Sequence, residues 1–98
     1  MMDITEWRKD VRIAAKQYLP SLLTHDGTHL HNIYSAFRAK EQALCDDSIP
    51  CEHNGVTYSG CEWMHQVRWA LQDLKSHEIV KNGPPQPEGW GLAAWRQG

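Results

Sequence analysis

The chain has 98 residues, of which 41% are hydrophobic and 22% charged, and its net charge is −2. These values are typical of one soluble globular domain, and the weak negative charge argues against indiscriminate nucleic-acid binding. There is no apolar run long enough to cross a membrane and no apolar stretch of a signal peptide at the N-terminus. The odd number of cysteines, three, argues against a secreted disulfide framework. We therefore expect a single cytoplasmic domain over residues 1–98.

The first predicted element is a helix capped by Asp3 or Thr5. Its apolar positions recur at helical spacing and are Ile4, Trp7, Val11, Ala14, Ala15 and Tyr18. Pro20 is expected to end or kink this helix, because proline lacks a backbone N–H and clashes with the preceding turn. The other side carries a basic cluster, Arg8, Lys9, Arg12 and Lys16. We interpret this cluster first as solvated surface, with phosphate contact as the alternative.

A turn at residues 25–28 and a short strand at 28–30 lead into a second predicted helix. The apolar face of this helix is formed by Leu30, Ile33, Tyr34, Phe37 and Leu44. Residues 45–60 then break the helical period, with turn signals at Pro50, Asn54-Gly55 and Ser59-Gly60. We predict an elaborated loop here, with only Val56-Thr57-Tyr58 extended.

The clearest period in the chain lies between Cys61 and His77. The positions i, i+3, i+4 and i+7 are apolar, which predicts a helix with one buried stripe, Val67, Ala70, Leu71 and Leu74. The opposite face is expected to carry polar side chains and one tryptophan, namely Glu62, His65, Trp69, Gln72, Asp73 and Ser76, with Arg68 and Lys75 on the flank. Such residues are more typical of recognition than of simple solvation. Two strands, 79–82 and 90–92, follow around a Pro/Gly-rich turn.

A long helix followed by a hairpin is how a winged helix-turn-helix ends. The predicted fold class is therefore α+β, with three helices and a small antiparallel β-wing. In this fold the third helix enters the major groove of DNA. Arginine suits guanine, glutamine suits adenine, and histidine suits a base or a phosphate. The expected DNA-binding residues are His65, Gln66, Arg68, Trp69, Gln72, Lys75, Lys81 and Asn82.

The last third of the chain also resembles a known family. The segments Trp63–Lys75, His77–Val80 and Gly89–Ala93 are similar to the N-terminal winged-helix domain of Mrr-type and related modification-dependent restriction endonucleases. The shared pattern is an Arg-Trp-Ala helix ending in Leu-Lys, an aliphatic pair, a wing and an aromatic-x-Leu strand, and His77 stands where the family usually has glycine. The resemblance implies a prokaryotic, monomeric module that reads double-stranded and possibly methylated DNA for a fused or associated nuclease.

Trp69 has two interpretations. The helical wheel points it outward, toward DNA, whereas its place in the family motif favours a structural role under the wing, against Trp90 or Trp95. If Trp69 is exposed, its ring suits the apolar methyl group of a modified base. The candidates for a modified-base pocket are Tyr58, Trp63 and Trp69, with Trp90 as a further one. Of these, Tyr58, Trp63 and Trp90 are each expected in the core.

The cysteines and histidines raise the question of a metal. Residues of the types that bind zinc are Cys45, Cys51, Cys61 and His65, with His53 nearby. Intervals of five, nine and three residues lack the C-x2-C knuckle of a typical zinc site, so we predict neither a metal site nor a cofactor. Cys61 and His65 stand at i and i+4, but nothing in the sequence orients the histidine for catalysis. There is no nuclease or phosphate-loop motif either, and no catalytic residue is predicted.

Two alternatives to DNA recognition in restriction stay open. One is a winged helix that binds another protein, which the net charge and the aromatic residues favour. The other is a transcriptional regulator of the same fold, which would need a dimer on a palindromic site. The sequence contains no evident dimerisation helix.

Overall fold

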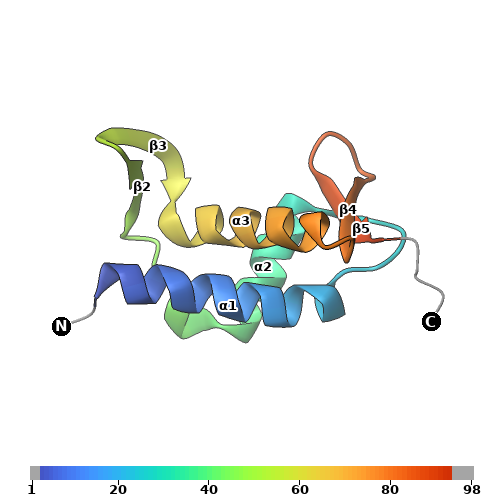
Figure 1. Ribbon diagram of the computed structural model, residues 1–98, viewed down its shortest axis with the longest axis horizontal. Helices are drawn as coiled ribbons and strands as arrows, with labels where there is room; N and C mark the ends of the chain where they lie inside the picture. Colours follow the sequence, from blue (N-terminus) through green and yellow to red (C-terminus); the bar gives the residue numbers. More distant parts are fainter. Residues whose placement is uncertain (1–2, 94–98) are drawn as a thin grey trace.

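The computed structural model describes residues 3–93. Within this range the elements follow the order α1 (Ile4–Leu22), β1 (Thr28–His29), α2 (Leu30–Lys40), the short 3-10 turn η1 (Gln42–Leu44), β2 (Pro50–His53), β3 (Val56–Cys61), α3 (Glu62–Ser76), β4 (Val80–Gly83) and β5 (Gly89–Leu92). The predicted α+β class, with three helices and small antiparallel sheets, is confirmed for the described part of the chain (Figure 1).

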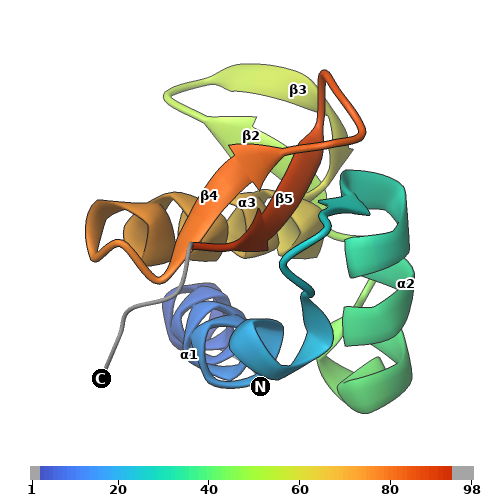
Figure 2. The same cartoon turned by 90° about the vertical axis from the view of Figure 1, so that its right-hand side faces the viewer.

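Helices α1 and α3 lie side by side, and α2 packs beside them (Figures 1 and 2). The stripe predicted for α3 is buried against the apolar side of α1, and the core it forms contains Trp7, Val11, Ala15, Leu19, Val67, Ala70, Leu71 and Leu74. From α2, Ile33 and Phe37 complete this core. Each large apolar side chain buried in this way contributes roughly 1.5–3 kcal/mol to stability.

The ends of the first two helices differ in part from the prediction. Asp3 caps α1 as expected, because its side chain accepts a hydrogen bond from the backbone N–H of Thr5 at 2.9 Å. Pro20 does not end the helix: it lies in the last turn and α1 runs on to Leu22, although proline has no N–H to donate to the carbonyl oxygen of Lys16. Helix α2 ends at Lys40, so Leu44 lies in η1, where its carbonyl oxygen accepts from Trp7 Nε1 at 3.1 Å.

The C-terminal strands form the predicted hairpin and extend it. β5 lies between β4 and β1, so the strand order is β1-β5-β4, with Thr28 opposite Trp90 and Val80 opposite Leu92. Val80 and Trp90 are buried, which joins this sheet to the helical core. Residues 94–98, which include Trp95, lie outside the described part of the chain.

The loop predicted for residues 45–60 contains a second hairpin. β2 and β3 pair through a two-residue turn at Asn54 and Gly55, whose φ angles of 54° and 79° are those of a type I′ turn. This hairpin stands at the N-terminal end of α3 and the β4–β5 hairpin at its C-terminal end (Figure 1). Both rise on the same side of the molecule. Among residues 3–93, no helix has the length and apolar character to cross a membrane.

Candidate nucleic-acid interface

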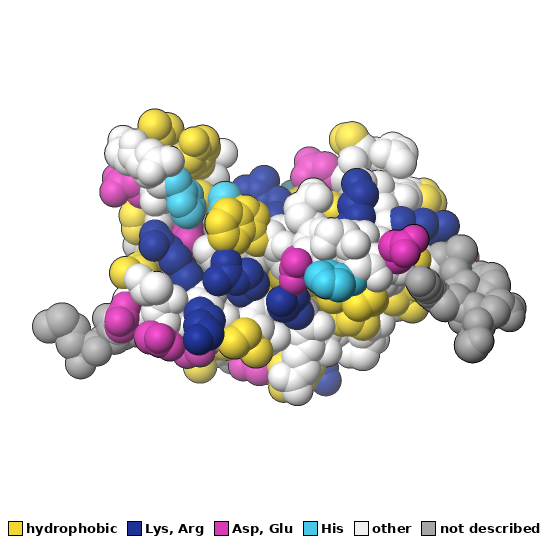
Figure 3. Space-filling view, viewed as in Figure 1, with side chains coloured by type: hydrophobic (Ala, Val, Ile, Leu, Met, Phe, Trp, Pro, Cys, Tyr) yellow, Lys and Arg dark blue, Asp and Glu magenta, His cyan; other side chains and the backbone are white. Residues whose placement is uncertain are grey.

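The outer face of α3 forms the floor of a saddle whose two walls are the hairpins (Figures 1 and 3). Four of the predicted contact residues in α3 are exposed there, namely Arg68, Trp69, Gln72 and Lys75. Lys81 and Asn82 are exposed on β4. The structure thus brings six of the eight predicted residues to the exposed surface of α3 and of the β4–β5 hairpin.

A direct contact joins α3 to the β4–β5 hairpin. Lys75 Nζ donates a hydrogen bond to Asn82 Oδ1 at 2.7 Å, so the polar surface of α3 continues onto β4. Arg68 makes no ion pair within residues 3–93, although its charge opposes the effect of burial at Tyr34, whose pKa is raised to about 12. The guanidinium of Arg68 is therefore available to an outside ligand.

Gln66 is wrongly predicted as a DNA contact. Its side chain is 1% exposed, and its Nε2 donates to Glu62 Oε2 at 2.8 Å. Glu62, expected on the solvent face, is fully buried and accepts a second hydrogen bond from Arg8 Nε at 2.7 Å. Helix α1 covers this side of α3. The buried part of the α3 surface is therefore wider than the apolar stripe of α3. Burial raises the pKa of Glu62, but the bonds from Gln66 and Arg8 outweigh it and the net pKa is lowered.

Trp69 is a surface residue, so of its two interpretations the buried structural role under the hairpin is not borne out. Half of its side chain is exposed, whereas Trp90 is buried in β5, and Trp95 lies outside the described residues. The guanidinium carbon of Arg12 lies 5.3 Å from the centre of the Trp69 ring, within cation–π range. Beside this pair is an open groove of about 500 Å³, lined by Arg12, Lys16, Trp69, Gln72, Asp73 and Ser76.

The predicted modified-base pocket is not assembled. Trp63 lies in the core as expected, stacked on Phe37, and its Nε1 donates to Asp47 Oδ1 at 2.7 Å. Tyr58 was expected in the core but is 51% exposed on β3, because that strand has no sheet or helix against this face. Trp69 lies on the helix surface. The three side chains therefore do not line one cavity.

The basic cluster of α1 is largely engaged within the molecule. Arg8 pairs with Glu62, Lys16 Nζ lies 2.8 Å from Asp73 Oδ2, and Arg12 covers Trp69. Lys and Arg side chains gather on the face made by α1 and α3 (Figure 3). Two of these charges are neutralised by the carboxylates of α3, so the cluster joins the helices more than it attracts phosphate.

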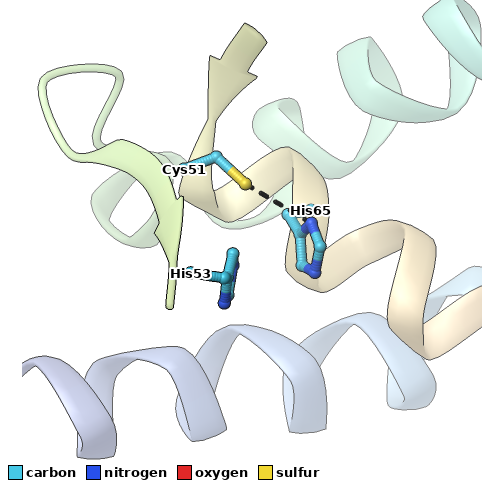
Figure 4. A group of neighbouring side chains, drawn as sticks. All are labelled: Cys51, His53 and His65. Carbon is cyan, nitrogen blue, oxygen red and sulfur yellow. Dashed lines mark hydrogen bonds between the residues drawn. The ribbon is translucent and has the colours of Figure 1, made fainter. Parts of the chain in front are cut away.

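His65 faces the β2–β3 hairpin. Its Nδ1 lies 3.4 Å from Cys51 Sγ, and its ring centre lies 4.5 Å from that of His53 (Figure 4). Burial raises the pKa of the Cys51 thiol and lowers that of the His65 imidazole. Both groups are therefore held in their neutral forms. This position places His65 at the edge of the saddle rather than on its floor.

The structure separates the five residues that the sequence offers as possible zinc ligands. It gathers Cys51, His53 and His65, whereas Cys45 is half-buried elsewhere and Cys61 Sγ donates to Asp47 Oδ1 at 3.7 Å. The gathered set was missed because its first two members share a strand that was predicted as loop. Cys51 and His53 are two residues apart, and such residues point to the same face of a strand. The Asn54-Gly55 turn was the signal for that strand.

Comparisons with protein-family models, curated proteins and solved structures find no match for this chain. The similarity to Mrr-type winged helices therefore rests on the residues quoted for it, Trp63–Lys75, His77–Val80 and Gly89–Ala93.

Proposed function

We propose that this chain is a winged helix-turn-helix domain that binds double-stranded DNA through α3 and the β4–β5 wing. The order of the elements supports this fold. A short strand after the first helix pairs with the C-terminal hairpin, which gives the strand order β1-β5-β4 directly beside α3. The β2–β3 hairpin is then an insertion between the second and third helices.

The observation that carries the proposal is the continuous polar surface from α3 to β4. Arg68 and Gln72 lie exposed on the helix, and Lys75 is bonded to Asn82 on the wing. A helix of 15 residues is roughly 22 Å long, and the major groove, about 12 Å wide, accepts a helix. With α3 in the groove, the wing would lie along the adjacent backbone.

Within this surface the residues divide by chemistry. Arg68 has the two-pronged donor geometry that pairs with guanine, and Gln72 suits adenine. Lys75 and Lys81 are placed for phosphate contacts, which set affinity and not sequence preference. Gln66 has no part, because it is buried.

The resemblance to modification-dependent nucleases adds a biological role to the proposal. The module would recognise methylated DNA for a fused or associated nuclease domain. The half-exposed ring of Trp69, steadied by Arg12, offers an apolar face to a base methyl group. Such a contact contributes at most about 1 kcal/mol per methyl. Discrimination would therefore also need a penalty against the unmodified base.

The test is the affinity of the chain for methylated and unmethylated duplexes, measured by fluorescence anisotropy at several salt concentrations. Arg68→Ala is expected to weaken binding by about 1–3 kcal/mol, or about 5- to 150-fold. The matched control is Lys40→Ala, which removes one positive charge at the end of α2 farthest from the sheet. Equal losses in both variants, or binding that does not weaken with salt, would contradict the proposal.

A second candidate function is binding of another protein. The specific observation in its favour is Trp69, a large aromatic side chain half exposed beside a groove in a chain of net charge −2. Salt distinguishes the two, because counterion release makes DNA binding steeply salt-dependent. A transcriptional regulator of the same fold would instead sediment as a dimer on a palindromic duplex.

A further inference from the structure

Three potential metal ligands meet where the β2–β3 hairpin touches α3. Cys51 and His53 come from one face of β2, and His65 comes from the first turn of α3 (Figure 4). One donor atom from each lies within 4.8 Å of the other two. Cys51 is 1% exposed and both histidines are half-buried, so the set is enclosed on most sides.

The spacing fits a zinc ion. A tetrahedral zinc with ordinary bond lengths separates a sulfur from a nitrogen ligand by about 3.5 Å and two nitrogens by about 3.3 Å. Cys51 Sγ and His65 Nδ1 are already 3.4 Å apart. The third ligand atom, on His53, lies within 4.8 Å of the other two, and a small shift of the exposed β2–β3 hairpin would close the remaining gap.

A carboxylate already orients one of the histidines. His53 Nε2 lies 3.2 Å from Glu62 Oε1, which leaves Nδ1 of the same ring for a metal. Metal-bound histidines almost always donate their other N–H to such a group. Glu62 is itself fixed, because its Oε2 accepts from Arg8 Nε at 2.7 Å and from Gln66 Nε2 at 2.8 Å. The possible ligands are therefore held in place by further hydrogen-bonded side chains.

A simple thiol–imidazole pair does not account for all the polar atoms. His65 Nε2 is buried and has no hydrogen-bond partner among the described residues. Polar atoms buried without a partner are rare in folded proteins, and each calls for an explanation. Zinc bonded through Nε2 would satisfy this atom, whereas zinc bonded through Nδ1, the nitrogen beside Cys51 Sγ, would leave Nε2 to donate its proton to a water molecule.

The geometry points to a zinc-binding site formed by Cys51, His53 and His65 that fastens the β2–β3 hairpin to α3. One thiolate and two imidazoles are ligands that zinc prefers, and three protein ligands leave its fourth position for water. Binding would release the thiol proton of Cys51. The site does not depend on DNA binding, but it removes His65 from the set of residues free to contact a base.

Zinc binding to the full chain tests the site directly. Protein stripped with a chelator is titrated with Zn²⁺ alone, and with Co²⁺ as a spectroscopic probe. We expect one saturable ion per chain, with tetrahedral cobalt bands and a thiolate-to-cobalt charge-transfer band. Folded protein, checked by circular dichroism, that takes up no stoichiometric zinc would overturn the site.

Matched variants identify the ligands. Cys51→Ser and His53→Gln are each expected to weaken zinc binding by at least about tenfold. Cys61→Ser is the control, since its thiol contacts Asp47 and not the cluster, and it should keep the wild-type affinity. The His53 side chain is partly exposed on the hairpin, so His53→Gln is expected to fold and to report on zinc binding alone. Wild-type affinity in Cys51→Ser, or loss of binding in Cys61→Ser, would refute the assignment.

The fastening role has its own readout. Zinc should slow amide hydrogen exchange in β2 and β3 and leave exchange in β4 and β5 unchanged. If zinc binds but exchange in β2 and β3 does not change, the ion does not hold the hairpin. None of these measurements involves DNA, so a failed DNA-binding experiment leaves them intact.

Discussion

The two hairpins at the ends of α3 are attached to the molecule by different forces. The β4–β5 hairpin is part of the core: Val80 and Trp90 are buried, and β5 gains a third strand in β1. The β2–β3 hairpin is a two-stranded ribbon with exposed side chains such as Val56 and Tyr58. A two-stranded hairpin by itself is at best marginally stable in water.

Polar contacts hold the second hairpin in place. Cys51 meets His65, His53 meets Glu62, and Asp47 at the base of the hairpin accepts from Trp63. Apolar burial stabilises a segment regardless of protonation, whereas these contacts depend on pH and on any bound metal. The β4–β5 hairpin is thus a fixed part of the fold, and the β2–β3 hairpin is a segment whose position can respond to conditions.

The largest effect that would test this contrast is expected from Trp90→Ala. Removing the buried indole leaves a cavity between the sheet and the helices and should lower the free energy of unfolding by about 3–5 kcal/mol. Urea denaturation followed by circular dichroism measures this loss. Tyr58→Ala on β3 is the control, with an expected change within about 0.5 kcal/mol. Losses of similar size in both variants would mean that the hairpins are attached alike.

Glycine substitutions at the two turns should give the next effect. A Cβ at Gly89 would lie 2.2 Å from the carbonyl oxygen of Gly83, so Gly89→Ala is expected to lower the free energy of unfolding by about 2 kcal/mol. A Cβ at Gly55 meets nothing within 4 Å, and only its φ of 79° opposes alanine. Gly55→Ala should therefore cost about 1 kcal/mol.

The two glycine variants should also destabilise different parts of the molecule. Gly55→Ala should speed amide hydrogen exchange in β2 and β3 while the midpoint of global unfolding hardly moves. Gly89→Ala should shift the global midpoint, because its hairpin unfolds together with the core. If Gly55→Ala shifts the global midpoint as far as Gly89→Ala does, the β2–β3 hairpin also unfolds with the core.

The parts of the fold that obey a local period could be predicted from the sequence. The stripe of α3, the Asp3 cap and the strands of the wing follow from spacing and capping chemistry within a few residues. The β2–β3 hairpin was missed although Asn54-Gly55 is a strong hairpin signal, because its strands are short and the apolar side chains of β3, Val56 and Tyr58, are exposed. Of the side chains in the two strands, only that of Cys51 is buried.

The candidate sites depended on contacts between distant residues. Glu62 looks like a surface residue on a helical wheel, and Gln66 was predicted to contact DNA. Both are buried where α1 packs on α3, and Arg8 of α1, 54 positions away from Glu62, bonds the Glu62 carboxylate there. For Trp69 the helical wheel correctly predicted an exposed side chain, whereas the family motif favoured the core. The Cys51 cluster needed both the hairpin and its docking on α3. Neither the hairpin nor its docking can be predicted from the spacing of the ligand residues in the sequence.

The smallest effect is expected from Asp47→Asn, and it concerns pH. The hydrogen bond from Trp63 Nε1, followed by the contact with Arg38, lowers the pKa of Asp47 below its usual 3.8. A lowered carboxyl pKa stabilises the fold above the unfolded-state value, and this stability is lost as the pH falls through the folded-state value.

Asparagine at position 47 keeps an oxygen for Trp63 but loses the charge. The variant should be slightly less stable near neutral pH, and its stability should fall less steeply between about pH 5 and about pH 2. Urea denaturation at each pH measures the slope, with Asp10→Asn on α1 as the control for removing one negative charge. The protection factors of amides in β2 and β3, which correct for the intrinsic pH dependence of exchange, should fall with acid in the wild type and fall less in the variant, while those in β4 and β5 stay high. Equal acid sensitivity of the two hairpins in the wild type would show that Asp47 does not anchor the β2–β3 hairpin by its charge.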